Sequence, residues 1–305
     1  MTTFLIRRAL NTVLVLLGVA TVTFFLLRIT GDPVAALLPL DATPEAIARM
    51  KAQLGMDRPL GVQYLNYLGN ILQGDFGISL RYREPALELF KQRFPATLEL
   101  LVAAVALSLA VGIPAGIIAA RNRGKPIDSA VMAFALFGQA VPAFYLGLML
   151  MLFFSVQLGW LPTGGRGTLA QLVMPTFVLG AYLMALTARM TRSSLLETFG
   201  RDYIRTAKAK GLAARFVVYK HALKPALIPI ITVVGLQVGM LFSGAVVTET
   251  VFTWPGIGRL AMEAISSRDF PVVQCVVVIS SSLFVFVNVV TDVLYGIVDP
   301  RVRYG

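Results

Sequence analysis

The segment DYIRTAKAKGLAARFVVYKHALKPALIPIIT, residues 202–232, begins as a basic stretch and continues without a break into an apolar one. It belongs to a longer connection, Arg189–Lys224, which carries nine basic and two acidic residues, a net charge of +7. Strongly basic connections between apolar spans stay on the cytoplasmic side of a membrane. The segment therefore predicts a membrane protein in which a basic cytoplasmic loop leads directly into a transmembrane helix.

The composition of the whole chain supports a membrane protein. Of its 305 residues, 57% are hydrophobic and 14% are charged, whereas soluble domains contain about 25% charged residues. A helix needs about 20 apolar residues to cross the hydrocarbon core, and the strand-period alternation of a β-barrel is missing from the sequence. The predicted fold class is an all-α membrane protein with six transmembrane helices: Leu10–Ile29, Leu98–Ala120, Ser129–Leu158, Leu169–Ala188, Pro225–Val247 and Val272–Val298.

Two of these spans have features of their own. The 30 residues of Ser129–Leu158 would reach about 45 Å as a straight helix, so we expect tilt, a kink at Pro142 or an end that lies in the interface. Arg7 and Arg8 precede the first span, whose apolar run is longer than a signal-peptide core and has no small-residue cleavage site. The first span therefore reads as an uncleaved anchor, and the arginine pair serves topology rather than twin-arginine export.

The distribution of basic residues predicts the orientation. An even number of spans puts both termini on one side, and the basic connections place that side in the cytoplasm. Residues 31–95 have seven basic and seven acidic residues, which places them outside. We expect three regions: residues 1–30 with the first helix, an extracytoplasmic insert at 31–95, and a five-helix core at 96–305 that contains the cytoplasmic loop 189–224. The localisation predicted is the cytoplasmic, or inner, membrane.

Several chemical functions find no support in the sequence. The lone Cys275 cannot form a disulfide within the chain, and the lone His221 cannot form a histidine metal cluster. The RGKP and GGRG stretches lack the pattern of a phosphate-binding loop, and no catalytic set is found. We therefore expect no catalytic residues, no metal and no cofactor on this chain. The basic charge is explained by topology, so nucleic acid is not expected as a partner.

Short helices are predicted outside the spans. In residues 43–55, Thr43 is a plausible N-cap, Pro44 a first helical residue and Gly55 a stop. Residues 58–77 place Val62, Leu65, Leu68 and Leu72 on one face, which suits a helix on the membrane, under a partner, or in a packed lid. Residues 249–271 contain a Pro-Gly turn followed by a short helix that ends near Arg268.

Polar residues within the spans have two interpretations each. Asp292 is the only deep acid, either an ion-coupling residue or a hydrogen-bonded packing residue. Glu99, Glu249 and Arg28 lie at span ends, where long side chains can reach water. Uncharged polar residues either line a path for a polar solute or join helices by hydrogen bonds: Gln139, Gln237, Ser243 and Asn288. The spacings of Gly112 with Gly116 and of Gly235 with Gly239 predict close helix contacts.

The basic loop predicts a helical hairpin. Leu196, Phe199, Tyr203 and Ala207 form an apolar stripe at helical spacing, and Arg201, Arg205 and Lys208 lie on another face. Gly211 suits the end of this first helix, and a second helix begins near Ala213 and continues into the fifth span. Such a hairpin either docks on a cytoplasmic partner or rests on anionic lipid.

At this loop the sequence resembles the membrane permease subunits of ATP-binding-cassette importers, in the dipeptide, oligopeptide and nickel branch. The family motif is Glu-Ala-Ala, three residues, Gly, nine residues and Ile-x-Leu-Pro. Gly211 matches its glycine, Thr206 and Ala207 its second and third residues, and Leu223 its leucine. Arg205, His221 and Lys224 replace the glutamate, isoleucine and proline, with Pro225 one place late, departures that agree with the peptide branch. Further similar segments follow along the chain: GDP at 31–33, LGMDRPLGVQYL at 54–65, GDFGIS at 74–79, PATLEL at 95–100, GWLPT at 159–163, VFTWPGIGRL at 251–260 and DPRVRYG at 299–305.

The resemblance implies a type I importer permease fold and an assembly. Its members pair with a second, similar permease, bind two ATPase subunits that hold ATP and Mg, and receive solute from an extracytoplasmic binding protein. It implies that the loop residues Arg201, Tyr203, Arg205, Thr206, Ala207, Lys208, Gly211, His221 and Leu223 couple to the ATPases, with Tyr203 and Ala207 as an apolar ridge. The expected solute is a peptide, with glutathione, nickel chelates or saccharides as alternatives. A secondary carrier or channel and a membrane enzyme remain as other classes.

Overall fold

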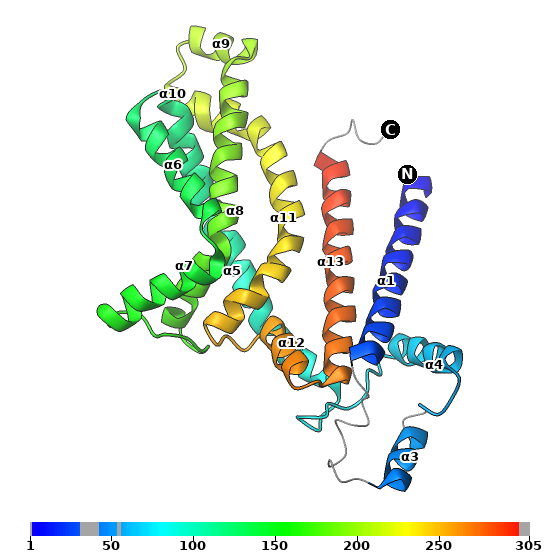
Figure 1. Cartoon of the computed structure of the whole chain (residues 1–305). Coiled ribbons are helices and arrows are strands. Elements are labelled where there is room, and N and C mark those ends of the chain that lie inside the picture. Colours follow the sequence, from blue (N-terminus) through cyan, green and yellow to red (C-terminus); the bar gives the residue numbers. More distant parts are fainter. Residues whose placement is uncertain (1, 31–42, 54–55, 299–305) are drawn as a thin grey trace. The chain divides into compact units, whose positions relative to one another are not determined.

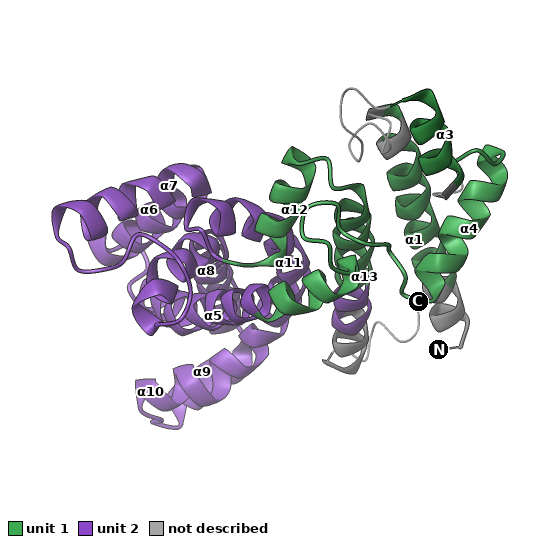
Figure 2. Cartoon of the chain, turned by 90° about the horizontal axis from the view of Figure 1, so that it is seen from below, with its two compact units in different colours: residues 1–95, 255–285 green, residues 96–254, 286–305 purple. Residues whose placement is uncertain are grey.

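A computed structural model describes residues 2–30, 43–53 and 56–298. These residues form helices joined by turns, with one isolated antiparallel bridge between Ile78 and Pro85. The chain divides into two compact units (Figure 2), one of residues 1–95 and 255–285 and the other of residues 96–254 and 286–305. Helices α5 and α13 each run through a boundary between the units.

Unit 1 contains the short helices expected from the sequence. Its elements are α1 (Thr2–Thr30), α3 (Pro44–Gln53), α4 (Leu60–Leu72), α12 (Ile257–Ser266), the beginning of α5 (Ala86–Arg121) and the first half of α13 (Phe270–Val298). The backbone N–H of Ala46 donates to Thr43 Oγ1 at 3.3 Å, which confirms the N-cap of α3. The predicted stop at Gly55 lies outside the described residues. The short helix after the Pro-Gly turn is confirmed as α12.

A buried carboxylate fastens the loop before α5 to the start of α13 within unit 1. Asp269 is 1% exposed and accepts hydrogen bonds from Ser79 Oγ at 2.5 Å, the Leu80 N–H at 3.2 Å and the Arg81 N–H at 3.3 Å. Beside it, Tyr82 donates its hydroxyl to Glu263 at 2.8 Å. Four donors on two carboxylates hold this loop in place.

The environment of Glu263 favours its ionised form. Burial acts to raise the pKa of this carboxyl, but the hydrogen bonds from Tyr82 and Arg259 and the charges of Arg259 and Arg93 act against it. The pKa of Glu263 therefore lies below its ordinary value. Burial and the bond to the Glu263 carboxylate raise the pKa of Tyr82, which keeps the phenol protonated as a donor.

Unit 2 is a bundle whose central helix is α8 (Figure 1). Thr168 begins α8 with a capping box formed with Gln171, and the helix packs against α6 and α11. The elements of unit 2 after α5 are α6 (Pro126–Ala140), α7 (Ala143–Leu150), η1 (Met151–Gln157), α8 (Leu169–Phe199), α9 (Asp202–Ala209), α10 (Ala214–Phe216), η2 (Val217–Ala222) and α11 (Leu223–Val251).

Four described helices are long and apolar enough to cross a membrane: Ala86–Arg121, Leu169–Phe199, Ala214–Val251 and Phe270–Thr291. The pair α6 and α7–η1 reaches the same criterion together but bends by 106°. The bend lies at the extended Val141 and at Pro142, which confirms the predicted kink. In α1 the apolar window, Leu10–Leu26, is shorter than in the four long helices. Six spans and cytoplasmic termini therefore remain predictions.

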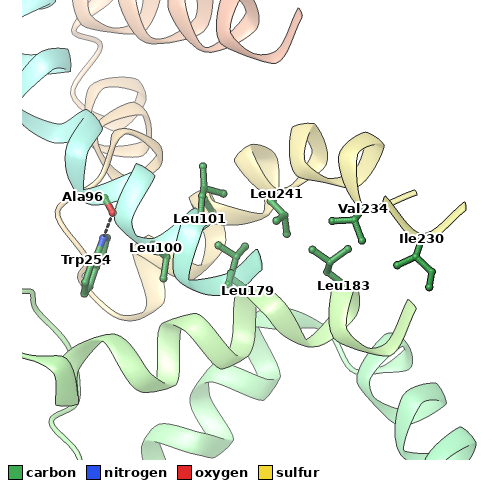
Figure 3. Packing of buried hydrophobic residues seen from close by; sticks show 11 residues of the cluster. Ala96, Leu100, Leu101, Leu179, Leu183, Ile230, Val234, Leu241 and Trp254 are labelled. Carbon is green, nitrogen blue, oxygen red and sulfur yellow. Dashed lines mark hydrogen bonds between the residues drawn. The ribbon is translucent and has the colours of Figure 1, made fainter. Parts of the chain in front are cut away.

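The core of unit 2 lies where α5, α8 and α11 meet. Leu100 and Leu101 of α5 pack with Leu179 and Leu183 of α8 and with residues of α11 (Figure 3). The indole N–H of Trp254, 1% exposed, donates to the carbonyl oxygen of Ala96 at 2.8 Å. This bond satisfies the polar atom of the largest fully buried side chain and fixes the end of α11 to α5.

Glycines permit two close helix approaches in this unit, as predicted for Gly112, Gly116 and Gly235, whereas the close contact at Gly239 stays a prediction. A Cβ added to Gly116 would lie 2.5 Å from the carbonyl oxygen of Ala188 in α8, and one added to Gly112 would lie 2.8 Å from that of Met184. A Cβ on Gly235 would lie 2.6 Å from Thr291 Cγ2 in α13. At Gly112 and Gly116 the α8 backbone therefore lies too close for a Cβ, and at Gly235 the Thr291 side chain occupies that space.

Candidate functional site

The basic loop forms the predicted helical hairpin. Helix α8 ends at Phe199, the chain turns at Gly200 and Arg201, and α9 follows. Gly211 has a φ of 77°, the left-handed conformation expected of it, and its N–H donates to the Lys208 carbonyl at 3.0 Å. The second helix continues from Ala214 through η2 into α11, as predicted. One difference is that the turn at Gly200 divides the apolar stripe, which was expected to lie on a single helix.

An apolar cluster lies inside the hairpin. Ile204 and Ala207 of α9 are 0% and 7% exposed and pack with Leu195 of α8, Ile117 of α5 and Val217 of η2. The expectation that Ala207 forms an exposed ridge with Tyr203 is wrong, because α9 turns Ala207 toward the chain's own core. The spacing of the stripe predicted an apolar face, and tertiary packing decided which partner covers it.

The outer face of the hairpin is aromatic and basic. Tyr203, Phe216 and Tyr219 are exposed by 46%, 49% and 56%. The exposed basic residues on this segment are Arg201, Arg205, Lys208, Lys210, Arg215 and Lys220. We call these nine residues the outer face. Phe216 and Tyr219 were not among the expected coupling residues, although their aromatic character beside basic residues could have indicated them.

Ion pairs within the hairpin neutralise little of the positive charge of the outer face. Arg201 contacts Glu197 at 2.5 Å and Arg205 contacts Asp202 at 3.5 Å. All four side chains are more than half exposed, so each pair contributes less than about 1 kcal/mol.

The remaining expected coupling residues lie along the same segment. Thr206 Oγ1 donates to the backbone of Asp202 at 3.1 Å. His221, at the end of η2, and Leu223, at the start of α11, are half-buried, and Leu223 packs on the hairpin cluster.

The four expected path residues lie in different environments within the part of the chain that the structure describes. Gln139, Gln237 and Asn288 are half-buried and Ser243 is exposed. The Nε2 atom of Gln139 is buried and has no hydrogen-bond partner among the described residues. A cavity of about 80 Å³ between α5, α6 and α8 is lined by apolar residues and includes none of these four. The side chain of Asp292 lies outside the described part of the chain.

Charged residues at the span ends differ from one another. Glu99 is exposed and pairs with Arg166 at 2.6 Å, in agreement with its expected access to water. Glu249 is 0% exposed and accepts a hydrogen bond from Thr97 at 2.5 Å, so the expectation that it reaches water is wrong. The packing of α11 against α5 covers it. The side chain of Arg28 is outside the described residues.

Among the side chains that the structure describes, no three His, Cys, Asp or Glu gather as a metal site.

Family comparisons cover both parts of the chain. Residues 112–304 match the family described as "Binding-protein-dependent transport system inner membrane component". Residues 1–101 match the family that describes the N-terminal part of such membrane components.

Individual relatives align over nearly the whole chain. A "Di/tripeptide transport system permease protein DppB" of Pseudomonas aeruginosa is 43% identical, with 100% of this chain and 99% of that protein covered. A "Dipeptide transport system permease protein DppB" of Escherichia coli is 40% identical, with 99% and 98% covered. A "Glutathione transport system permease protein GsiC" of Salmonella typhimurium is 41% identical, with 100% of both covered.

Solved structures agree with the fold. An inward-facing MetNI methionine ABC transporter has a TM-score of 0.59 and 20% identity, with 69% of this chain and 96% of that chain covered. An amino acid ABC transporter has a TM-score of 0.55 and 15% identity, with 68% and 93% covered. At these identities the likeness concerns the fold alone. The matches to the family over both halves, with relatives of 40–43% identity across the full length, show that the chain belongs to the binding-protein-dependent transport system inner membrane components.

Proposed function

We propose that the chain is the permease subunit of an importer that moves peptides inward across the cytoplasmic membrane. Partner ATPases drive this importer. Support comes from relatives named for dipeptide and di/tripeptide transport at 40% and 43% identity over the full chain. The proposed assembly has a second, similar permease, two ATPase subunits that hold ATP and Mg, and an extracytoplasmic binding protein that delivers the peptide.

The observation that carries the proposal is the two-sided hairpin. Its outer face presents exposed aromatic rings and exposed basic groups to a partner, and its inner face is fixed by the cluster around Ile204. That cluster contains residues of α5, α8 and α11, three helices long enough to span a membrane. A displacement imposed on the outer face therefore reaches three spans together, since close-packed interiors transmit strain.

The proposed mechanism is alternating access. ATP closes the ATPase pair and carries the hairpin of each permease with it, so the permeases change from inward-open to outward-open. ATP and the loaded binding protein must both favour the outward-open state, because a ligand shifts an equilibrium only by its differential affinity for the two states. Gly211 provides the turn of the hairpin, and Leu223 joins it to α11.

A variant at Tyr203 tests the docking face. Tyr203→Ala removes an exposed ring and leaves the inner cluster intact, so ATPase subunits should co-purify less well and ATP-driven dipeptide uptake into proteoliposomes should fall. Tyr145→Ala removes a ring of similar exposure, 50%, from α7 and serves as the matched control. Ala207→Glu should also abolish uptake, but by placing a charge inside the hairpin, and it should lower thermal stability as well. Unchanged ATPase binding and uptake in Tyr203→Ala would contradict the proposed docking face.

A second solute class is favoured by one comparison. The GsiC relative, at 41% identity, is named for glutathione transport, and glutathione is itself a tripeptide. Uptake of labelled dipeptide and labelled glutathione by the assembled importer separates the two solutes. The same experiment without nucleotide but with a proton gradient tests the alternative of a secondary carrier, which predicts uptake that needs no ATPase subunit.

A further inference from the structure

Outside the hairpin, an ion pair joins two helices of unit 2 near the same end. Arg192 of α8 donates from Nε to Asp128 Oδ1 at 2.6 Å and from Nη2 to Asp128 Oδ2 at 2.7 Å. The backbone N–H of Gly124 donates to Asp128 Oδ2 at 3.0 Å. The Asp128 side chain is 6% exposed and that of Arg192 is 27% exposed. Two parallel bonds from one guanidinium fix both distance and orientation between the helices.

The position of this pair connects it to the hairpin. Asp128 lies in the first turn of α6, directly after the turn that follows α5. Arg192 lies seven residues before the end of α8 at Phe199, and α9 begins three residues after that end. Figure 1 shows the turn between α5 and α6 at the end of unit 2 where α9 and α10 lie. The pair therefore attaches the start of α6 to the part of α8 that carries the hairpin.

Beyond the pair, α6 packs on α8, but that packing leaves a cavity. The cavity of about 80 Å³ lies there, lined by Val131, Phe134 and Ala135 of α6 and by Met184, Ala185 and Ala188 of α8, together with residues of α5. Side chains that line a void lack partner atoms on one side and so hold the helices less firmly. The ion pair is thus the directional contact between the two helices, beside packing that a cavity interrupts.

We propose that the Asp128–Arg192 ion pair is a mechanical tie that makes α6 follow α8 when the hairpin is displaced. This inference rests on the proposed function, since it assigns to two further residues the transmission of movement from the ATPases. Through α6 the displacement reaches the bend of 106° at Val141 and Pro142 and the helix α7 beyond it. Asp128 and Arg192 are positioning residues, and neither is assigned a contact with solute or nucleotide.

The test is the number of peptides imported per ATP hydrolysed by the complete transporter in proteoliposomes. Asp128→Asn keeps the shape of the side chain but removes its charge, and the ratio should fall by about 5-fold or more while ATP hydrolysis continues. Arg192→Lys keeps the charge but not the two parallel bonds, so its ratio should lie between wild type and Asp128→Asn. Glu99→Gln breaks an exposed ion pair at the other end of α8 and should leave the ratio unchanged.

Charge exchange tests whether the lost ratio comes from breaking the pair rather than from the single substitution itself. The double variant Asp128→Arg with Arg192→Asp should recover part of the ratio lost by Asp128→Asn, since the pair is restored with its ends reversed. A wild-type ratio in Asp128→Asn would overturn the inference and leave the proposed function intact. Absence of ATP-driven uptake in the wild-type assembly would instead refute the proposed function. Where Asp128→Asn yields too little complex, Arg192→Lys provides the measurement, and a wild-type ratio there has the same meaning.

Discussion

Replacing Gly116 with alanine tests the packing of α5 on α8. The new Cβ would lie 2.5 Å from both the Ala188 carbonyl oxygen and Thr191 Cβ, whereas carbon atoms in contact are separated by about 3.5–4.0 Å. The helices must therefore move apart by about 1 Å at this point, which forfeits a quarter to a half of each dispersion contact across the gap. Overpacking of this kind costs about 1–3 kcal/mol, and the better helix propensity of alanine returns about 1 kcal/mol.

The expected net loss for Gly116→Ala is about 1–2 kcal/mol, since the clash involves backbone and a β-branched side chain that cannot turn aside. Thermal unfolding of the purified protein in lipid nanodiscs should show a Tm lower by roughly 2–8 °C, taking about 2–4 °C per kcal/mol. Gly112→Ala, with its nearest atoms at 2.8 Å, should lower the Tm less. Gly69→Ala in α4 meets nothing within 4 Å and is the control. A Tm for Gly116→Ala equal to or above that of the control would refute the close approach.

Three further predictions concern single groups. Gly211→Ala should reduce ATP-driven uptake, because alanine in the left-handed conformation costs about 1–2 kcal/mol, while Gly211→Asn should reduce it less; equal uptake in both variants would contradict this. Trp254→Phe should lower the free energy of unfolding by about 2–3 kcal/mol by deleting the donor to Ala96 and leaving a void, as measured by thermal unfolding. The ionised Glu263 stabilises the loop before α5 at pH values above the ordinary glutamate pKa of about 4.3, and this stabilisation is lost as the pH falls through the lower folded-state pKa. Tyr82→Phe removes a hydrogen bond to this carboxylate, so protease cleavage in residues 74–85 should begin at a higher pH than in the wild type.

Local features of the fold were predictable because each depends on a few neighbouring residues. The N-cap at Thr43, the kink at Pro142 and the left-handed Gly211 follow from residue types whose backbone preferences are strong. The close approaches at Gly112 and Gly116 also follow from spacing on one helix face. In these cases the interaction that fixes the structure lies within one or two helical turns, or needs only a small side chain facing any partner.

Features set by distant parts of the chain were not predictable in this way. The sequence placed Glu249 at a span end, but only the fold shows that α5 and Thr97 cover it. It also placed Ala207 on an apolar face, and the hairpin turned that face inward because Ile117 of α5 and Val217 of η2 offered apolar contacts. The turn at Gly200 was missed since an isolated glycine within a helical pattern is tolerated and need not end the helix.

The two ion pairs beside α8 show that the contribution of a charged pair to stability depends on its exposure to water, and not only on its place along the helix. The pair of Arg166 with Glu99, before the start of α8, keeps side-chain exposures of 35% and 40%, so its loss should cost less than about 1 kcal/mol. The pair of Arg192 with Asp128 leaves the carboxylate only 6% exposed. Its disruption should cost more than that of the exposed pair, yet less than that of a fully buried pair, because the guanidinium keeps 27% exposure. Water can still stabilise a lone Arg192 but can hardly reach a lone Asp128. Removal of the arginine should therefore destabilise the protein more than removal of the aspartate, an order that a simple count of lost hydrogen bonds does not give.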